Sequence, residues 1–269
     1  MNTISFMGAN YVTRECGYRM PEEGWGQAHR RTSERFAPLA TFAERFGELA
    51  AEVAGHGFTA MDVWMAHLDP PWATDEHIAI ATGLLREHGL TVPSLAGSVG
   101  ATIEDFARVC RVAAGLGAPV VGGMAPVLAA DRAGVLALLE EHDLVLGVEN
   151  HPERTPEEYL AVLGDPHPRI GAALDTGWFG THGFDAAEAI EAVADRLVHV
   201  HLKDVKAPGG HETVGFGQGC VPIRACVEAL GRIGYGGAIS IEHEPELGDP
   251  VPDVLASREL LTQWMDGRI

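Results

Sequence analysis

Four apolar segments in the second half of the chain each end in side chains that can bind a metal ion or move a proton. The segments are Val148-Glu149-Asn150-His151, Leu174-Asp175-Thr176, Val200-His201-Leu202-Lys203-Asp204 and Ile241-Glu242-His243-Glu244. A carboxylate at the end of an apolar strand is costly to bury unless a cation or a hydrogen bond compensates its charge. A divalent cation would neutralise three converging carboxylates and use one imidazole nitrogen. This donor set suits Mn²⁺, Mg²⁺ or Co²⁺ better than structural zinc.

Short apolar runs recur along the whole chain and predict buried parallel strands, because most of them are bounded by Gly, Pro, Asp or Asn. The predicted strands are Ile4–Met7, Ala60–Trp64, Leu90–Leu95, Ala118–Val121, Leu144–Val148, Ile170–Leu174, Leu197–Leu202 and Ala238–Ile241. Between them, the spacing of apolar and capping residues predicts helices. These are an apolar helix face from Phe36 to Val53, helix starts at Thr74, Thr102, Thr155, Asp185, Pro222 and Pro252, and a helix near Asp131–Glu140.

Eight strands alternate with eight helices in this interpretation. That order requires a parallel sheet with right-handed crossovers, and eight complete units favour an α/β fold closed into a (β/α)8 TIM barrel. No Gly-x-Gly-x-x-Gly follows a strand and opens a helix, so a dinucleotide-binding sheet has no support. No change of composition divides residues 1–269, so we expect a single domain. The irregular segment 8–35 after the first strand is too long for an ordinary barrel loop and predicts a lid or a partner-contact segment.

The barrel rule locates the chemistry independently of the motifs. Active-site groups of such barrels lie at the carboxyl ends of the strands, where the four segments carry their polar residues. Any one of these residues alone is more simply explained as a solvated carboxylate or a satisfied core histidine. Four of them in phase with four consecutive strands predict one shared site.

Composition narrows the class of protein. The chain has 269 residues and 38 Asp and Glu against 19 Lys and Arg, a net charge of -19, which disfavours nucleic acid and anionic membranes as partners. None of its four cysteines forms a Cys-x-x-Cys pair, so neither a disulfide framework nor a cysteine zinc site is expected. The N-terminus lacks the features of a signal peptide, and a cytoplasmic location is expected.

The polar segments also carry a resemblance to a known family. The residues concerned are Gly147–Pro152, Leu174–Trp178, His199–Asp204 and Ile239–Glu244. They resemble the xylose-isomerase-like TIM barrels of the sugar phosphate isomerase/epimerase group, with its tagatose 3-epimerase, inosose dehydratase and hydroxypyruvate isomerase relatives. The likeness is close in the second half of the chain and loose in the first.

This resemblance implies one divalent metal ion, Mn²⁺ first and Mg²⁺ or Co²⁺ as alternatives, held by Glu149, Asp175, His201 and Glu242. It also implies that Glu149 and Glu242 are the catalytic acid/base pair. Such a site would remove a proton next to a carbonyl, and the ion would stabilise the resulting enediolate. A metal-dependent isomerase or epimerase of a small sugar is therefore the expected function.

One position departs from the family pattern. In epimerase and dehydratase relatives, a substrate-contacting histidine commonly follows the metal-binding aspartate by three residues, and this chain has Trp178 there. An indole can stack on a sugar or an aromatic aglycone but cannot exchange a proton as imidazole does. Trp178 is therefore either a substrate-binding residue or a packing residue, and the ketose 3-epimerase assignment is in doubt.

Four further residues are candidates for substrate chemistry. His151 would face the same side as Glu149 and could act as a general base, or it could be a loop histidine without a catalytic role. His67 follows the second strand and is placed to meet a substrate hydroxyl. Lys203 and His211 belong to the loop after the seventh strand, where Gly215–Gly219 could approach a phosphate. Because few cations accompany these glycines, we expect an unphosphorylated sugar.

Three alternatives to the isomerase remain open. Some proteins that resemble this group cleave 3-oxo-glycosides, including carbon-linked ones, with a small partner subunit. In such a lyase His151 would be the base, and Trp178 and segment 8–35 would suit an aromatic leaving group or the partner. An apurinic endonuclease would need more metal ligands and a basic face, and a non-catalytic sugar-binding barrel would not need the ligand quartet. The expected partners are a sugar or oxo-glycoside and either a second copy of the chain (a homo-oligomer) or a small subunit.

Overall fold

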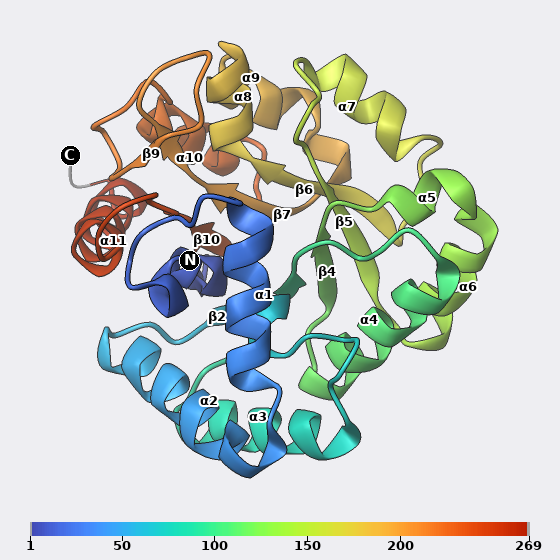
Figure 1. The fold of residues 1–269 in the computed structure, drawn as a ribbon. Helices are drawn as coiled ribbons and strands as arrows, with labels where there is room; N and C mark the ends of the chain where they lie inside the picture. The colour runs from blue at the N-terminus through green and yellow to red at the C-terminus, as the bar shows by residue number, and fades with distance from the viewer. Residues whose placement is uncertain (1, 268–269) are drawn as a thin grey trace.

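Eight parallel strands close into a barrel in the computed structural model, which describes residues 2–267 (Figure 1). Their order around the barrel is β1-β10-β7-β6-β5-β4-β3-β2. The barrel strands are β1 (Ile4–Met7), β2 (Met61–Trp64), β3 (Ser94–Ala96), β4 (Val120–Gly123), β5 (Val145–Glu149), β6 (Ile170–Asp175), β7 (Leu197–Leu202) and β10 (Ile239–Ile241). The predicted TIM barrel is confirmed. The strand predicted over Leu90–Leu95 begins only at Ser94, because the residues before it make a single isolated bridge, between Thr91 and Ala60.

Most helices begin where the capping residues predict. The predicted helices are α2 (Leu39–Gly55), α3 (Asp75–Glu87), α4 (Ile103–Leu116), α6 (Arg132–Glu141), α7 (Pro156–Leu163), α9 (Ala186–Ala192), α10 (Ile223–Arg232) and α11 (Val251–Met265). The side chains of Thr74, Thr102 and Thr155 each accept a hydrogen bond from a backbone N–H three residues later. These bonds satisfy donors that the first turn of a helix leaves free. Within residues 2–267, no helix is both long and apolar enough to cross a membrane.

Four elements were not predicted from the sequence. They are α1 (Trp25–Phe36), α5 (Pro126–Ala130), α8 (Thr176–His182), and the hairpin of β8 (Asp204–Val205) and β9 (Thr213–Val214). All four follow the carboxyl end of a barrel strand. They therefore build the face on which the polar strand ends lie.

Segment 8–35 is more regular than we expected. Two 3₁₀ turns, Gly8–Tyr11 and Arg14–Cys16, precede α1, which crosses the centre of the view in Figure 1. The buried face of α1 includes Ala28, Thr32 and Phe36, one helical turn apart. Only Ala28 and Phe36 of these three are apolar, so this helix has a weaker periodic signal than a core helix.

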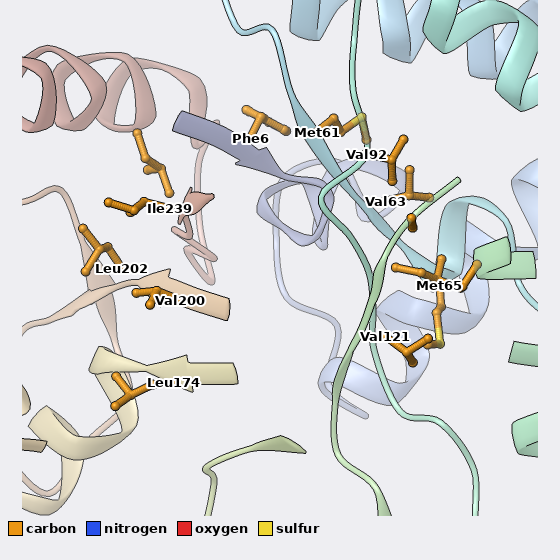
Figure 2. Close-up of a cluster of buried hydrophobic side chains, with 14 of the residues drawn as sticks. Phe6, Met61, Val63, Met65, Val92, Val121, Leu174, Val200, Leu202 and Ile239 are labelled. Carbon is orange, nitrogen blue, oxygen red and sulfur yellow. The ribbon is translucent and has the colours of Figure 1, made fainter. Parts of the chain in front are cut away.

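Successive side chains of each barrel strand point alternately outward, to the core between strands and helices, and inward, to the centre of the barrel. Outward-facing residues such as Phe6, Val63 and Val200 pack with the surrounding helices in the main hydrophobic core, part of which Figure 2 shows. Many inward-facing positions are small or polar, although Met7 and Trp64 form a second buried apolar cluster at the ends of β1 and β2. Buried Asp62 on β2 accepts hydrogen bonds from Ser94 on β3 and from Ser240 on β10, and the latter contact crosses over β1 through the barrel interior. The centre of this barrel is therefore polar.

A bulge explains why glycine is required at the base of β6. The register of β6 on β7 shifts between Ala172 and Ala173. At Gly171, a Cβ atom would lie 2.4 Å from the carbonyl oxygen of Arg196 and 2.4 Å from a methyl group of Val198. One of these contacts is backbone, so a side-chain rotation cannot relieve both.

We predict that Gly171→Ala lowers the free energy of unfolding by about 1–3 kcal/mol, the usual cost of overpacking a core. Denaturant unfolding followed by circular dichroism measures this change. Gly83 in α3 has no neighbour within 4 Å of a Cβ position, so Gly83→Ala is the matched control and should be neutral or stabilising. Equal stability of Gly171→Ala and the wild type would contradict the clash.

Candidate metal centre

Three predicted ligands meet at the mouth of the barrel. Glu149 ends β5, His201 lies near the end of β7, and Glu242 directly follows β10. The Nδ1 atom of His201 is 2.8 Å from Oε1 of Glu149 and 3.1 Å from Oε2 of Glu242. One donor atom from each residue lies within 4.8 Å of the other two. The strand order brings these residues together, because only β6 separates β5 from β7, and β10 neighbours β7.

Asp175, the fourth predicted ligand, lies next to this group and turns toward a lysine. On the neighbouring strands β6 and β7, Asp175 is the register partner of His201. Its Oδ1 accepts a hydrogen bond from the backbone of Gly177, and its Oδ2 is 3.0 Å from Nζ of Lys203. Asp175 is therefore adjacent to the three converging ligands without sharing their point of convergence.

Lys203 is an internal counter-charge of the site. Its ammonium group lies 3.0 Å from Asp175, 3.2 Å from Glu242 and 3.1 Å from Glu244, and only 3% of its side chain is exposed. We expected Lys203 to contact substrate. In this structure its ammonium group contacts three carboxyl groups instead, so it is not free to bind a phosphate.

The crowded charges shift the protonation of the ligands. Burial alone would lower the pKa of His201, but Glu242 and Glu149 raise that pKa well above its usual value. Burial would raise the pKa of Glu242, but Lys203 and His201 hold it far below its usual range, and His201 likewise lowers the pKa of Glu149. Burial raises the pKa of Asp175 to about 6 although Lys203 opposes the shift. Two ionised glutamates therefore flank a protonated imidazole.

Buried side chains clamp the backbone at three of these positions. The amide of Asn150 bonds both the N–H and the C=O of Asp175, at 2.9 and 3.0 Å. Asn10 bonds the C=O of Ile241 and the N–H of His243, on the two sides of Glu242.

The third clamp is the hydroxyl of Thr176, which bonds the N–H and the C=O of Lys203, both at 2.9 Å. No sequence pattern predicted a role for these clamp residues. Asn150 and Thr176 at least adjoin the predicted ligands. Asn10 carries no such signal, because 232 positions separate it from Glu242.

Histidine rings surround Trp178. The imidazole of His211 stacks on the indole with ring centroids 3.7 Å apart and planes 13° apart. His151 lies 5.0 Å from the indole and His182 lies 6.5 Å from it. His151 also places Nε2 3.7 Å from Oε2 of Glu149, so this cluster borders the carboxylates. One face of Trp178 is covered by His211 and is not free to stack on a sugar.

His67 lies elsewhere on the same face of the barrel. It follows β2, contacts the rings of Phe36 and Trp64, and lines a small cavity of about 140 Å³ with Arg14. Burial, with smaller effects of Arg14 and His29, lowers the pKa of His67 to about 3, so the ring is neutral. The two charged groups that lower the pKa of His67 are Arg14 in the first loop and His29 on α1, and neither belongs to the carboxylate cluster.

The glycine-rich loop binds a carboxylate of this chain. The backbone N–H groups of Gly217, Gly219 and Val221 all donate to the side chain of Asp204. A Cβ atom at Gly219 would lie 2.2 Å from the carbonyl oxygen of Val205, which explains the glycine. These amides are occupied, so they are not available to a phosphate.

The donor set fits a divalent ion. Metal–oxygen bonds of about 2.1 Å in an octahedral site separate neighbouring donor atoms by roughly 3 Å, and the His201 contacts of 2.8 and 3.1 Å match that spacing. The acidic oxygens of Glu149 and Glu242 are directed at a single imidazole nitrogen. Replacement of the proton on Nδ1 by a metal ion would satisfy all three residues.

Comparisons with known proteins agree with the fold. A family model described as xylose isomerase-like TIM barrel matches residues 49–264. A xylose isomerase domain protein from Planctomyces limnophilus has a TM-score of 0.70 and 20% identity, over 80% of this chain and 91% of that one. A probable 3-DHS dehydratase from Bacillus anthracis, described as involved in petrobactin synthesis, has a TM-score of 0.71 and 13% identity, over 97% and 99% of the two chains.

A third solved structure and one curated relative complete the comparison. The IolI protein, solved with a bound zinc atom, has a TM-score of 0.71 and 14% identity, over 100% of this chain and 99% of that one. An uncharacterized protein from Methanocaldococcus jannaschii is 27% identical over 141 residues, which is 49% of this chain and 46% of that protein. The match thus spans about half of the curated relative. Together with the closed barrel, the family match over residues 49–264 shows that this chain belongs to the xylose isomerase-like TIM barrel family.

Proposed function

We propose that this protein is a divalent-metal-dependent isomerase or epimerase of a small sugar, which moves a proton on a carbon next to a carbonyl. The observation that carries the proposal is the convergence of Glu149, His201 and Glu242, with donor atoms within 4.8 Å of one another at the barrel mouth. Solved structures with this fold include a D-allulose 3-epimerase from Methylomonas sp., at 19% identity, a TM-score of 0.66 and coverage of 82% of this chain and 92% of that one. That likeness concerns the fold, and the activity is our inference.

In this proposal Glu149, Asp175, His201 and Glu242 hold one ion. Three carboxylates and one imidazole suit Mn²⁺, with Mg²⁺ or Co²⁺ as alternatives. When bound, the ion supplies Lewis-acid stabilisation of the negative charge that develops on the substrate oxygens. Asp175 would complete the set by turning its Oδ2 from Lys203 toward the shared point.

The two glutamates can move the proton. Both have lowered pKa values and are carboxylates at neutral pH, so either can accept a proton from the substrate carbon. They reach the site from β5 and from the end of β10, on two sides of His201. If one removes the proton and the other returns it to the opposite face, the carbon is epimerised. If the proton returns to the neighbouring carbon, the sugar is isomerised.

The recognised molecule is proposed to be an unphosphorylated sugar. Lys203 is buried among carboxylates, and the amides of the glycine-rich loop bond Asp204. Neither group is therefore free to bind a phosphate. Trp178 and His211 instead present an aromatic and hydrogen-bonding wall beside the carboxylates.

One observation favours a second candidate, a lyase that eliminates the aglycone of a 3-oxo-glycoside. His151 lies 3.7 Å from Glu149 but outside the group of converging donor atoms, and 24% of its side chain is exposed. An imidazole in that position can accept a proton without binding the ion. Release of free aglycone from an oxidised glycoside, in the presence or absence of a small partner subunit, would favour the lyase over the isomerase.

We predict that the purified protein loaded with Mn²⁺ exchanges a carbon-bound proton of a ketose such as D-tagatose or D-allulose with deuterated solvent. Chelation should abolish the exchange. Glu149→Gln and Glu242→Gln should each lower turnover at least about 100-fold, on the order of 3 kcal/mol in activation free energy. Proton NMR in D₂O measures the exchange.

The matched control is Glu157→Gln, an exposed glutamate in the first turn of α7, which should leave the rate unchanged. If both site variants keep near-normal rates while Glu157→Gln also does, the acid/base roles are wrong. If the wild type exchanges no ketose, inosose or oxo-sugar proton, the isomerase proposal itself fails.

We also predict that the protein releases about one proton for each metal ion bound at pH 7, because the raised pKa of His201 keeps its ring protonated without the metal. The apparent association constant should therefore rise about tenfold per pH unit near neutral pH. Below pH 6 the dependence should steepen, since Asp175 with a pKa of about 6 then also binds a proton.

Calorimetric titration of Mn²⁺ in buffers of different ionisation enthalpy measures the released protons. His182→Gln is the control, because His182 belongs to the neighbouring histidine cluster but not to the ligands, and it should release the same number. A metal affinity independent of pH from 5 to 8 would contradict the role of His201.

A further inference from the structure

The ring of His211 is fixed in one orientation by two neighbours. It comes from the turn between β8 and β9 and stacks on Trp178, which belongs to α8, the helix that directly follows Asp175. Its Nδ1 atom lies 2.7 Å from the hydroxyl of Thr181, one turn further along α8. The stacked indole and the hydroxyl together define both the plane and the rotation of the imidazole.

The hydrogen bonds of Thr181 favour one tautomer of His211. The Thr181 hydroxyl has one proton, which it donates to the carbonyl oxygen of Gly210 at 3.1 Å. With its proton in that bond, the hydroxyl accepts from His211 at 2.7 Å, and the imidazole then carries its own proton on Nδ1. The Nε2 atom then keeps its lone pair and can only accept a hydrogen bond.

This Nε2 atom is buried and has no hydrogen-bond partner among residues 2–267. The charged and titratable groups that influence the pKa of the ring are Lys203, Glu242, His151 and His182. Burial and the nearby Lys203 together lower the pKa of His211 to about 3 although Glu242 opposes the shift, so the ring is neutral. A buried acceptor without a protein donor can be completed by an ordered water or by a group of a ligand.

We propose that Nε2 of His211 accepts a hydrogen bond from a free hydroxyl of the substrate, and that Trp178 and Thr181 are positioning residues that fix the orientation of this ring. This inference rests on the proposed function and narrows its substrate class. The sugar must keep a free hydroxyl at the position that meets His211. A phosphate dianion there would bring only acceptor oxygens to an acceptor nitrogen, and the site would reject it.

The test uses the Mn²⁺-loaded protein with D-tagatose, D-allulose and D-fructose 6-phosphate as probes. His211→Phe keeps a ring that can stack on Trp178 but lacks Nε2. It should raise the dissociation constant of the better unphosphorylated ketose about tenfold, the usual effect of one lost hydrogen bond. The exchange rate at saturation should change less than the dissociation constant, because the glutamates are intact. The 6-phosphate should bind more weakly than either free ketose.

Variants of Thr181 distinguish a role in fixing the tautomer of His211 from a purely structural role. Thr181→Val removes the acceptor for Nδ1–H, so the ¹⁵N NMR signals of His211 should show mixed tautomers, and ketose binding should weaken. Thr181→Ser keeps the hydroxyl and should restore both properties. In the wild type, Nε2 should be unprotonated at pH 7.

Two results would overturn the proposal. One is a proton on Nε2 of His211 in the wild-type spectrum. The other is a wild type that binds the free ketoses no better than His211→Phe does, including the case in which neither protein binds them. Failure of the proposed function gives a different pattern, in which ketoses bind in a His211-dependent way but no carbon-bound proton exchanges. Glu149→Gln should give that pattern as well, since it leaves His211 in place.

Discussion

The mutual repulsion of buried carboxylates is the constraint on which the rest of this structure depends. Glu149, Asp175, Glu242 and Glu244 lie at one end of the barrel around Lys203 and His201. Burial would favour the neutral acids, and burial raises the pKa of Glu244 well above its usual value although Lys203 opposes the shift. Glu149 and Glu242 stay ionised only because cationic groups contact them. The site thus depends on the precise placement of a few positive charges.

That dependence accounts for the unusual polarity of the barrel interior. The clamps from Asn10, Asn150 and Thr176 fix the backbone on which the charged side chains stand. Below them, Asp62 is hydrogen bonded to serines and lies 3.1 Å from Nε2 of His199, whose ring meets that of His201 edge to face at 5.1 Å. An apolar interior would pack as well but would leave His201 without polar support. Hydrogen-bonded groups in a fixed arrangement hold charges where mobile water would not.

The sequence predicted those parts of the fold that local patterns determine. The eight strands and the caps at Thr74, Thr102 and Thr155 depend on neighbours a few residues away, so each is visible in the chain. Helix α1 was missed because its buried face is partly polar. The convergence of Glu149, His201 and Glu242 followed from the barrel rule, which converts strand order into proximity. The contact of Asp175 with Lys203 and the stacking of His211 on Trp178 depend on rotamers and loop paths, and no sequence pattern encodes them.

The charge balance connects the described structure to the proposed metal-bound state. At pH 7, Glu149, Asp175 and Glu242 carry three negative charges, while Glu244 is neutral because burial raises its pKa well above its usual value. Lys203 and His201 carry two positive charges, because the pKa of His201 is raised well above its usual value. A divalent ion that displaces the proton of His201 would leave three positive charges against three negative ones. The exchange of one proton for one dication would thus bring the net charge of the site to zero, whereas the exchange of one proton for a monovalent ion would leave the net charge unchanged. Lys203 is essential to this balance, since without it a single dication could not neutralise three carboxylates. In the proposed metal-bound state the lysine would thus be a fixed part of the binding site for the ion, which accounts for its burial among these carboxyl groups.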